Sequence, residues 1–375
     1  MSVRKREWTT AKGETKTAFI VDYKDRDGDR HIETFKTEGE AKDYEAKVRI
    51  DIKKGMHTAP SKSVTVAEAC ERWIKRVEAD NRERSTVDQY RQHAKIHIVP
   101  RLGKTKLANL TEQSVEGFRD DLLANLSRPL ARKVMVSLKQ MLRANKYSHV
   151  ADGISIKPDK RSKRRLEPGR DLPTPAEVKR MVALANDPRT RALLLLAALT
   201  GLRSSEMRGL RWSDVDMRHL ELHVRQRADR YYEIGAPKSA TSMRAIPLDQ
   251  DTLLPALKEW KLACPKGEAD LVFPDAEGGP VHHEILSRLL EAVMIEAGVV
   301  DKGGNAKYSP HAFRHFFASW CINPKERGGR ELTPKAAQTL LGHSSITMTL
   351  DLYGHMFPKG DDRAELAKSV SALLG

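Results

Sequence analysis

The sequence of 375 residues predicts a multidomain, mainly α-helical protein with small β-sheets. Apolar residues recur at helical spacing along most of the chain, whereas β-prone runs are confined to the N-terminus and to the middle of the last block. Two polar, proline-containing tracts, residues 57–62 and 157–170, interrupt these patterns and are typical of linkers. At this length, two or three domains are expected, each able to bury its own core.

The first part, residues 1–58, is expected to be an α+β module of strands followed by one helix. Two β-prone runs flank Asp27-Gly28, a dipeptide typical of hairpin turns. Thr37 and Glu40 have the spacing of a helix capping box, and the apolar residues after them recur every four positions. The β-prone runs are residues 17–23 and 31–35, and the recurring residues are Tyr44, Val48 and Ile52.

The second part, residues 64–155, is expected to be an all-α domain with Ser85 and Thr111 as candidate N-caps. A linker at residues 156–171 follows, because this stretch is strongly basic, contains two prolines and has almost no apolar residue. The helices of the domain are predicted near residues 66–79, 85–97, 111–125 and 129–146.

The third part, residues 172–375, is expected to be a mixed, mainly α domain. Residues 174–177, Thr-Pro-Ala-Glu, form a typical helix start, and residues 190–200 form an apolar helix. A final helix at residues 362–374 carries apolar residues on one face, which suits docking on a neighbouring molecule or on its own domain. Strand character is found in residues 219–225, 231–234 and 244–248.

The positive charge is concentrated in one region. The chain has 66 basic and 51 acidic residues, a net charge of +15, and residues 61–170 alone hold 25 basic and 13 acidic side chains. This concentration indicates nucleic acid, because Lys and Arg that neutralise phosphates release counterions, although a solubilising surface is the alternative. The linker residues expected to contact DNA are Lys157, Lys160, Arg161, Lys163, Arg164 and Arg165.

The composition argues against secreted and membrane-spanning classes. Cys70, Cys264 and Cys321 are odd in number and widely spaced, which is typical of reduced thiols in a cytosolic protein. The longest apolar run, residues 192–199, is shorter than the roughly 18–20 residues that a transmembrane helix needs, so no membrane partner is expected. The first residues lack the apolar core of a signal peptide. A cytoplasmic location is therefore expected.

Four short stretches of the third part carry the candidate chemistry. Any one of their charged residues, taken alone, is more often structural or solvated. Together they supply the groups that a phosphodiester transfer without a metal requires. The stretches are Thr200-Gly201-Leu202-Arg203-Ser204-Ser205-Glu206, Pro237-Lys238-Ser239, Ser309-Pro310-His311-Ala312-Phe313-Arg314-His315, and Leu340-Leu341-Gly342-His343-Ser344 followed by Tyr353.

Each residue type fits one need of that reaction. Two guanidinium groups, from Arg203 and Arg314, can hold the non-bridging oxygens of a pentavalent phosphorane in a bidentate way. Lys238, with a lowered pKa, can protonate a leaving alkoxide. His311 lies three residues before Arg314, so on a helix both can reach one phosphate. Tyr353 can form a covalent ester that conserves the bond energy for rejoining.

The order and the local contexts of these residues, TGLRSSE, HAFRH, LLGHSS and LYGH, resemble the tyrosine recombinase family, the phage integrases and their relatives. The segment of residues 90–103 is similar to the core-binding domain of that family, and residues 1–58 resemble its arm-binding module more weakly. Ala312-Phe313 depart from the commoner polar residue and Leu, at positions expected to face the core. The resemblance implies an arm-binding module, a core-binding domain and a catalytic domain.

The resemblance also implies a reaction. A site-specific integrase would cut and rejoin DNA through a 3′-phosphotyrosyl intermediate, and would integrate or excise a mobile element without a cofactor. Its partners would be double-stranded DNA with core and arm-type sites, three further copies of the chain in a tetramer, a DNA-bending host factor and a directionality factor, in the nucleoid of a prokaryotic host.

The same resemblance assigns a role to each site residue. Arg203, Arg314 and His343 would stabilise the scissile phosphate, and Lys238 would protonate the leaving 5′ oxygen. His311 would act as general acid or base for Tyr353, the nucleophile. Glu206 would orient the arginines from outside the reacting atoms.

Three alternatives compete with this interpretation. A metal site at His311 and His315 is not expected, because the intervening residues lack the glutamate of the HExxH motif and include a cation. A type IB topoisomerase-like relaxase uses similar groups. A DNA-binding factor on the same fold would have no reason to retain all six reactive side chains.

Overall fold

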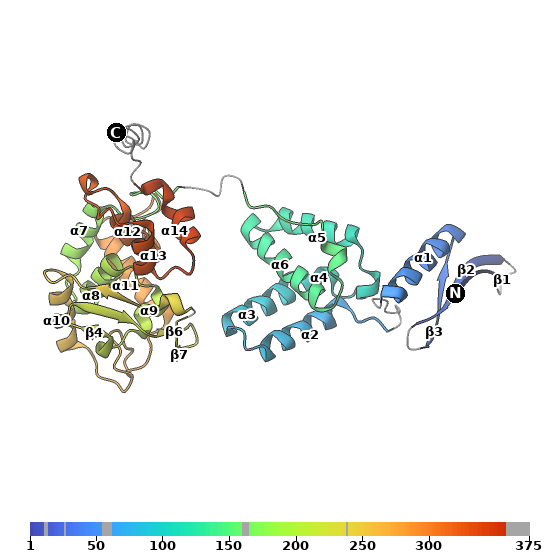
Figure 1. The fold of residues 1–375 in the computed structure, drawn as a ribbon, viewed down its shortest axis with the longest axis horizontal. Helices are drawn as coiled ribbons and strands as arrows, with labels where there is room; N and C mark the ends of the chain where they lie inside the picture. Colours follow the sequence, from blue (N-terminus) through green and yellow to red (C-terminus); the bar gives the residue numbers. More distant parts are fainter. Residues whose placement is uncertain (11–13, 26–27, 55–61, 160–164, 238, 358–375) are drawn as a thin grey trace, which may run out of the picture. The chain divides into compact units, whose positions relative to one another are not determined.

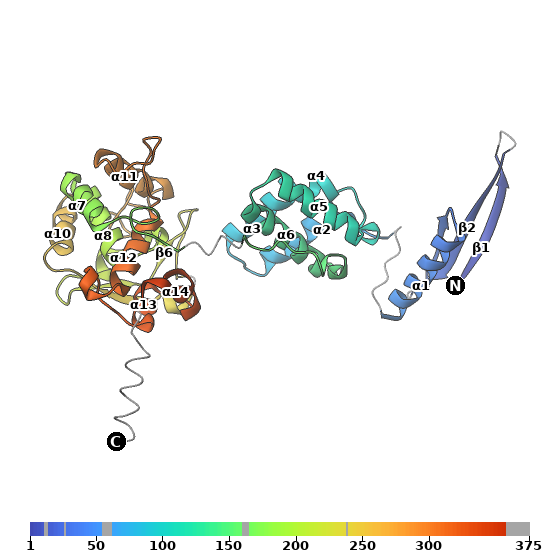
Figure 2. The same cartoon turned by 90° about the horizontal axis from the view of Figure 1, so that it is seen from above.

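A computed structural model describes residues 1–10, 14–25, 28–54, 62–159, 165–237 and 239–357. The chain divides into two compact units, Met1–Ser162 and Lys163–Gly375 (Figures 1 and 2). Helices dominate both units, and the strands form small antiparallel sheets. The predicted class, multidomain and mainly α with small β-sheets, is therefore confirmed. None of the helices in these ranges is long and apolar enough to span a membrane.

The first unit begins with an antiparallel sheet in the order β1 (Ser2–Thr9), β2 (Thr15–Lys24), β3 (Arg30–Phe35), and α1 (Glu38–Lys54) packs against it. The sequence analysis located β2 and β3 but not β1. Gly28 has a φ of +85° between β2 and β3, a conformation that favours glycine. Thr37 and Glu40 form the predicted capping box, with reciprocal bonds of 3.3 and 3.2 Å.

The rest of the first unit is helical, and its helices match the predicted ones closely. Thr111 is an N-cap, as predicted, because its side chain accepts a hydrogen bond from the Ser114 amide. Ser85 is not an N-cap: α3 begins at Arg84 and follows Glu83, so Ser85 lies inside the first turn. The helices are α2 (Val66–Ala79), α3 (Arg84–His93), a π-helical turn at Ala94–Ile98, α4 (Val99–Leu102), α5 (Glu112–Asn125) and α6 (Arg128–Ala144).

Apolar residues at the two edges of the predicted linker, residues 156–171, are buried in folded clusters. Ile156 is buried with the apolar cluster of the helical region, and Leu172 is buried with a cluster of the second unit. Pro168 and Leu172 form an isolated bridge around a turn at Gly169. A few apolar residues in a basic stretch are thus enough to attach its two ends to the folded units on either side.

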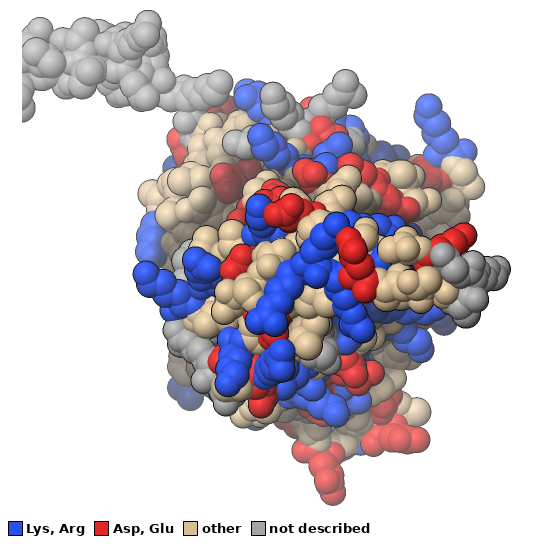
Figure 3. Space-filling model, turned by 90° about the vertical axis from the view of Figure 1, so that its right-hand side faces the viewer, with Lys and Arg blue, Asp and Glu red and all other residues tan. Residues whose placement is uncertain are grey.

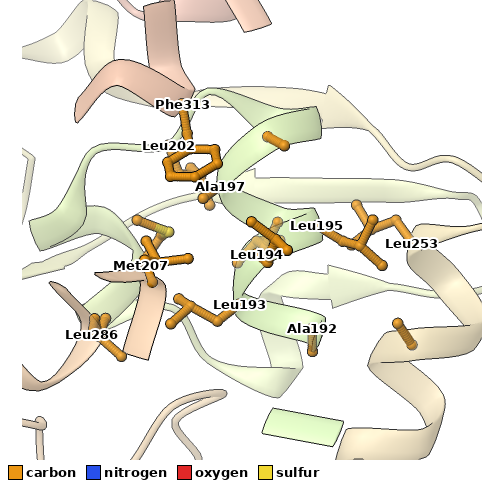
Figure 4. Close-up of a cluster of buried hydrophobic side chains, with 14 of the residues drawn as sticks. Ala192, Leu193, Leu194, Leu195, Ala197, Leu202, Met207, Leu253, Leu286 and Phe313 are labelled. Carbon is orange, nitrogen blue, oxygen red and sulfur yellow. The ribbon is translucent and has the colours of Figure 1, made fainter. Parts of the chain in front are cut away.

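The second unit is built around α8 (Pro188–Thr200), whose side chains are buried on nearly every face. Figure 4 shows the core around it, with Leu193 near Met207 and Leu286, and Phe313 against Leu202. The other helices are α7 (Pro175–Leu184), α9 (Ser204–Gly209), α10 (Leu253–Ala263), α11 (His283–Glu296), α12 (His311–Ile322), α13 (Pro334–Leu341) and α14 (Ile346–Tyr353). Thr174 and Glu177 form the predicted capping box before α7.

Two small sheets complete the second unit. The first has the order β4 (Val215–Asp216), β5 (Glu221–Val224), β8 (Arg244–Pro247), and the second pairs β6 (Arg227–Ala228) with β7 (Ile234–Gly235). The predicted strand at residues 231–234 is wrong over most of its length, because Tyr232 has a φ of +67° within a turn. The predicted helix at residues 362–374 lies outside the described residues.

Candidate active site

Arg203 lies at a sharp turn between two helices. The chain leaves α8 through Gly201, which has a φ of +61° and whose missing Cβ would lie 2.4 Å from the ring of Phe317. Glycine is therefore needed twice over, for conformation and for space. Arg203 then precedes α9, where its backbone amide donates to Glu206 Oε2 at 2.9 Å and its Nη1 donates to Glu206 Oε1 at 2.7 Å. The arginine side chain stays about one third exposed.

Glu206 is buried and is shared between two arginines. Arg244, from the start of β8, donates from Nη2 to Oε2 at 2.9 Å and from Nη1 to Oε1 at 3.2 Å. Both side chains of this pair are buried, with exposed fractions of 2% for Arg244 and 3% for Glu206. Burial by itself raises the pKa of Glu206, but the hydrogen bonds and charges of Arg244 and Arg203 hold it below the usual range. Glu206 is thus an anion that keeps Arg203 in place.

Arg314 lies on the inner face of α12 and is almost fully buried. Its Nη1 donates to the Gly201 carbonyl at 2.6 Å, which links it to the turn before Arg203. Burial and the charge of Arg203 lower the pKa of Arg314 to about 9, which still leaves it charged at neutral pH. Two cations are therefore held close together before any phosphate is present.

The C-terminal end of α13 receives three guanidinium groups on three successive carbonyls. The last carbonyls of a helix lack partners within the helix and carry the negative end of its dipole, so they favour cations. The bonds are Arg244 Nε to Leu340 at 2.7 Å, Arg314 Nη2 to Leu341 at 2.5 Å and Arg203 Nη2 to Gly342 at 2.8 Å. This helix end orients the arginine cluster and fixes the start of the segment that carries His343.

His343 follows directly and is buried. Its Nδ1 lies 2.9 Å from Thr349 Oγ1, and its carbonyl accepts from Gln338 Nε2 at 3.0 Å. Its ring stacks on the ring of Tyr353, with 6.4 Å between centroids and 6° between planes. Burial and the neighbouring arginines lower the pKa of His343 to about 4, so the imidazole is neutral at neutral pH.

Tyr353 ends α14 and is only 1% exposed. Its hydroxyl lies 2.7 Å from Nδ1 of His315, and burial raises its pKa to about 12 although Arg314 acts in the opposite direction. His311 is one helical turn before His315, is exposed, and places its ring edge-on to His315, with 4.7 Å between centroids. The phenol is thus hydrogen-bonded by His315 rather than by His311, the partner that the sequence analysis expected.

A cavity of about 340 Å³ opens beside the arginine cluster. Arg203, Glu206 and Gly342 line it, together with Pro237 and Ser239, the residues on either side of Lys238. Lys238 itself lies outside the described residues. Several hydroxyl groups add donors to the cavity, from Ser205, Ser239, Ser242 and Ser344. A cavity lined by two arginines, Arg203 and Arg227, and by these hydroxyls is suited to a phosphate group.

Only two of the six linker residues expected to contact DNA lie within the described residues. Lys157 is exposed, and Arg165 is exposed and accepts a hydrogen bond on its carbonyl from Arg170. Figure 3 shows Lys and Arg side chains interspersed with Asp and Glu on the face that it draws. Lys160, Arg161, Lys163 and Arg164 lie outside the described residues. Within the described ranges, no group of three His, Cys, Asp or Glu side chains could hold a metal ion.

Two family models match the chain. The profile described as "Phage integrase family" matches residues 173–359, and "Phage integrase, N-terminal SAM-like domain" matches residues 65–123. The matched range 173–359 contains the arginine cluster, His311, His343 and Tyr353. The chain belongs to the phage integrase family of tyrosine recombinases.

Relatives resemble the chain over different lengths. A tyrosine recombinase XerC-like protein of Caldanaerobacter subterraneus is 31% identical over 201 residues, which cover 49% of this chain and 50% of that protein, so the chain spans about half of it. The ICEBs1 integrase of Bacillus subtilis is 24% identical over 361 residues, 90% of this chain and 91% of that protein.

Two solved structures share the fold. The Tn1549 transposon integrase in complex with transposon right end DNA has a TM-score of 0.60 at 22% identity and covers 80% of this chain and 98% of that chain. A lambda integrase dimer bound to a COC′ core site has a TM-score of 0.58 at 19% identity and covers 92% of this chain and 93% of that chain.

Two residues of the site were missed by the sequence analysis. His315 was considered only as a metal ligand, although its place directly after Arg314 in the HAFRH stretch was a usable signal. Arg244 was counted only as part of a strand. Its signal is the alternation along β8, where Arg244 and Ile246 face inwards, so an arginine occupies a core position.

Proposed function

We propose that the chain is a site-specific DNA recombinase of the integrase type, which cuts and rejoins duplex DNA through a 3′-phosphotyrosyl intermediate and moves a mobile element. The observation that carries this proposal is the convergence of Arg203, Arg314, His343 and Tyr353 around one helix end, next to a cavity suited to a phosphate.

The roles follow from charge and position. Arg203 and Arg314 stabilise the charge that develops on the non-bridging oxygens of the scissile phosphate, and His343 donates to the same group. Tyr353 forms the covalent ester. Lys238 protonates the leaving 5′ oxygen, as the lining of the cavity by both of its neighbours supports. His311, which is exposed on α12 one turn before His315, acts as an acid or base.

The remaining parts bind DNA. Residues 64–155 and the basic linker at 156–171 contact the core site together with the catalytic domain, residues 172–375, and residues 1–58 bind arm-type sites. Recombination between two duplexes requires four protomers, and the apolar face expected on residues 362–374 suits docking on a neighbouring molecule or on its own domain. A DNA-bending host factor and a directionality factor complete the assembly. The protein acts at the nucleoid in the cytoplasm.

A nicked duplex that carries the core site tests the chemistry. The site is read from the DNA that flanks the gene, and the nick lets the short leaving strand diffuse away, so that a covalent adduct accumulates on a denaturing gel. Wild-type protein should form the adduct, and Tyr353→Phe should form none, because no other group can carry the link. Equal adduct from both proteins contradicts the proposal. Binding without cleavage would identify a DNA-binding factor instead.

A further inference from the structure

His315 occupies a position that the reaction described above does not use. It lies on α12, directly after Arg314 and one turn after His311, and it is partly buried. Its Nδ1 is 2.7 Å from the hydroxyl of Tyr353, and the two rings are 5.8 Å apart at an angle of 59°. A side chain from one helix thus contacts the nucleophilic oxygen carried by another.

The protonation states of the two groups decide the direction of this hydrogen bond. Burial, followed by the charges of His311 and Arg314, lowers the pKa of His315 to about 4. The imidazole is therefore neutral at neutral pH and can present an unprotonated Nδ1. Burial keeps the pKa of Tyr353 at about 12, so the phenol retains its proton and donates it to Nδ1. The nucleophile thus remains protonated until a base removes that proton.

We propose, building on the recombinase function proposed above, that His315 is a further catalytic residue, which holds the Tyr353 hydroxyl and accepts its proton during attack on the scissile phosphate. A bond forms between the tyrosine oxygen and phosphorus, and the bond between phosphorus and the 5′ oxygen breaks. The phenol proton moves to Nδ1 of His315, and the 5′ oxygen takes a proton from a separate acid. In the rejoining step, His315 returns its proton to the departing phenol.

The surroundings of His315 support proton transfer once DNA is bound. His311 and Arg314 on its own helix disfavour the imidazolium, whereas Asp171, from the segment before α7, favours it. Tyr353, and beyond it His343, face it from the side of α14. A bound phosphate adds negative charge, which favours the imidazolium and raises the pKa of His315. The phenol also becomes more acidic as its oxygen bonds to phosphorus.

The test compares single-turnover adduct formation by the full chain on the nicked duplex. His315→Phe keeps a ring but removes the base, and His315→Asn keeps an acceptor oxygen near the position of Nδ1. His315→Phe should cleave about 10²–10⁴-fold more slowly than wild type with unchanged affinity for the duplex. The cleavage rate of His315→Asn should lie between those of His315→Phe and wild type. His355→Asn is the matched control, because His355 is also close to α14 but bonds to the Leu166 carbonyl, and it should cleave at the wild-type rate.

A second substrate distinguishes a defect in deprotonating the nucleophile from a defect in protonating the leaving group. Sulfur in place of the 5′ bridging oxygen leaves without protonation, so it rescues the loss of a general acid but not the loss of a base on the tyrosine. The defect of His315→Phe should persist with this substrate. Rescue by sulfur, or cleavage of the normal duplex at the wild-type rate, overturns the assignment of His315. No adduct from wild-type protein overturns the recombinase function itself, and the role of His315 with it.

Two further measurements remain informative even if a substitution at His315 lowers the amount of folded protein. The rate of His315→Asn should rise about tenfold for each pH unit in mildly alkaline buffer, because hydroxide must remove the proton, while the wild-type rate levels off. In the DNA-free protein, ¹⁵N spectra should show an unprotonated Nδ1 on His315 whose shift changes in Tyr353→Phe. A flat rate profile for His315→Asn, or an unaltered shift, contradicts the proposal.

Discussion

Single residues of the site act mainly through fixed hydrogen bonds between buried ions. Arg244 is the clearest example, because its guanidinium satisfies Glu206, the Ser242 carbonyl and the Leu340 carbonyl together. Removing one member of a buried ion pair leaves the other without compensation. Arg244 thus stabilises the carboxylate that positions Arg203, although it lies away from the cavity lining.

Arg244→Met should lower the free energy of unfolding by about 3–5 kcal/mol, because the buried Glu206 carboxylate loses its buried ionic partner and keeps only its bonds to the partly exposed Arg203. It should also reduce cleavage, because Glu206, which holds Arg203, is no longer fixed by Arg244. Urea unfolding measures the first effect. The matched control is Arg288→Met on the exposed pair with Glu284, for which a change of about 0–1 kcal/mol is expected. Equal losses for the two variants contradict the role of Arg244.

The buried histidines should make stability depend on pH. Burial lowers the folded-state pKa of His343 to about 4, below the usual value of about 6.5. Between these values the unfolded chain binds more protons, so stability should fall as the pH falls from about 6.5 towards 4. His343→Asn should reduce this slope in urea unfolding series, whereas His219→Asn should not, because a hydrogen bond to Asp216 raises the pKa of His219. An unchanged slope for His343→Asn contradicts the burial of a neutral imidazole.

At the scale of elements, short turns place the candidate reactive side chains. The C-terminal turns of α8 and α13 end at Gly201 and Gly342, both with a φ of +61°. Helix starts at Thr37, Thr111 and Thr174 follow local capping rules and were predictable from the sequence. The π-helical turn at residues 94–98 and the turn at Tyr232 were not, because no local pattern encodes them.

Gly342→Ala should destabilise the protein by about 1 kcal/mol or more and should slow cleavage. A Cβ at this position would lie 2.8 Å from Nη1 of Arg244, on a backbone that alanine adopts only with strain. Thermal unfolding and adduct formation measure the two effects. The control is Gly117→Ala, within α5 and with no atom near the added Cβ, which should stabilise the protein by about 0.5–1 kcal/mol. Wild-type stability of Gly342→Ala would contradict this account of the helix end.

At the scale of the whole molecule, charge and chemistry are separated along the chain. Residues 61–170 hold 25 basic and 13 acidic side chains, whereas the catalytic region is nearly neutral overall. Part of the basic charge is paired within the helical region, for example Arg91 with Glu78 and Arg119 with Asp120. Affinity for DNA is therefore expected to depend on many phosphate contacts, and the reaction on a few placed cations.

Added salt should weaken DNA binding steeply, because it opposes counterion release. The covalent step on DNA that is already bound should change much less, since Arg314 and Glu206 are shielded from solvent. Filter binding and single-turnover cleavage in a preformed complex measure the two dependences. An equally steep fall in both contradicts the separation of affinity from chemistry.

Deletion of residues 1–58 should abolish binding to arm-type sites and leave cleavage of core sites intact, because that module has its own small core of Val21, Tyr23, Ala41 and Val48. Gel shifts with arm and core duplexes, together with adduct formation, measure the outcome. Loss of core cleavage in a truncated protein that remains folded contradicts the proposed division into domains.

The sequence by itself determined the family, the fold class and most helices, and it supplied the candidates for the reactive side chains. These depend on local periodicity, capping and short motifs, which neighbouring residues encode directly. Only the tertiary structure decided which side chains meet. Arg244 reaches Glu206 across 38 positions, and His315 reaches Tyr353 across 38 positions, so no local pattern could pair them. Long-range packing of α12, α13, α14 and β8 sets these contacts, and with them the protonation state of Tyr353.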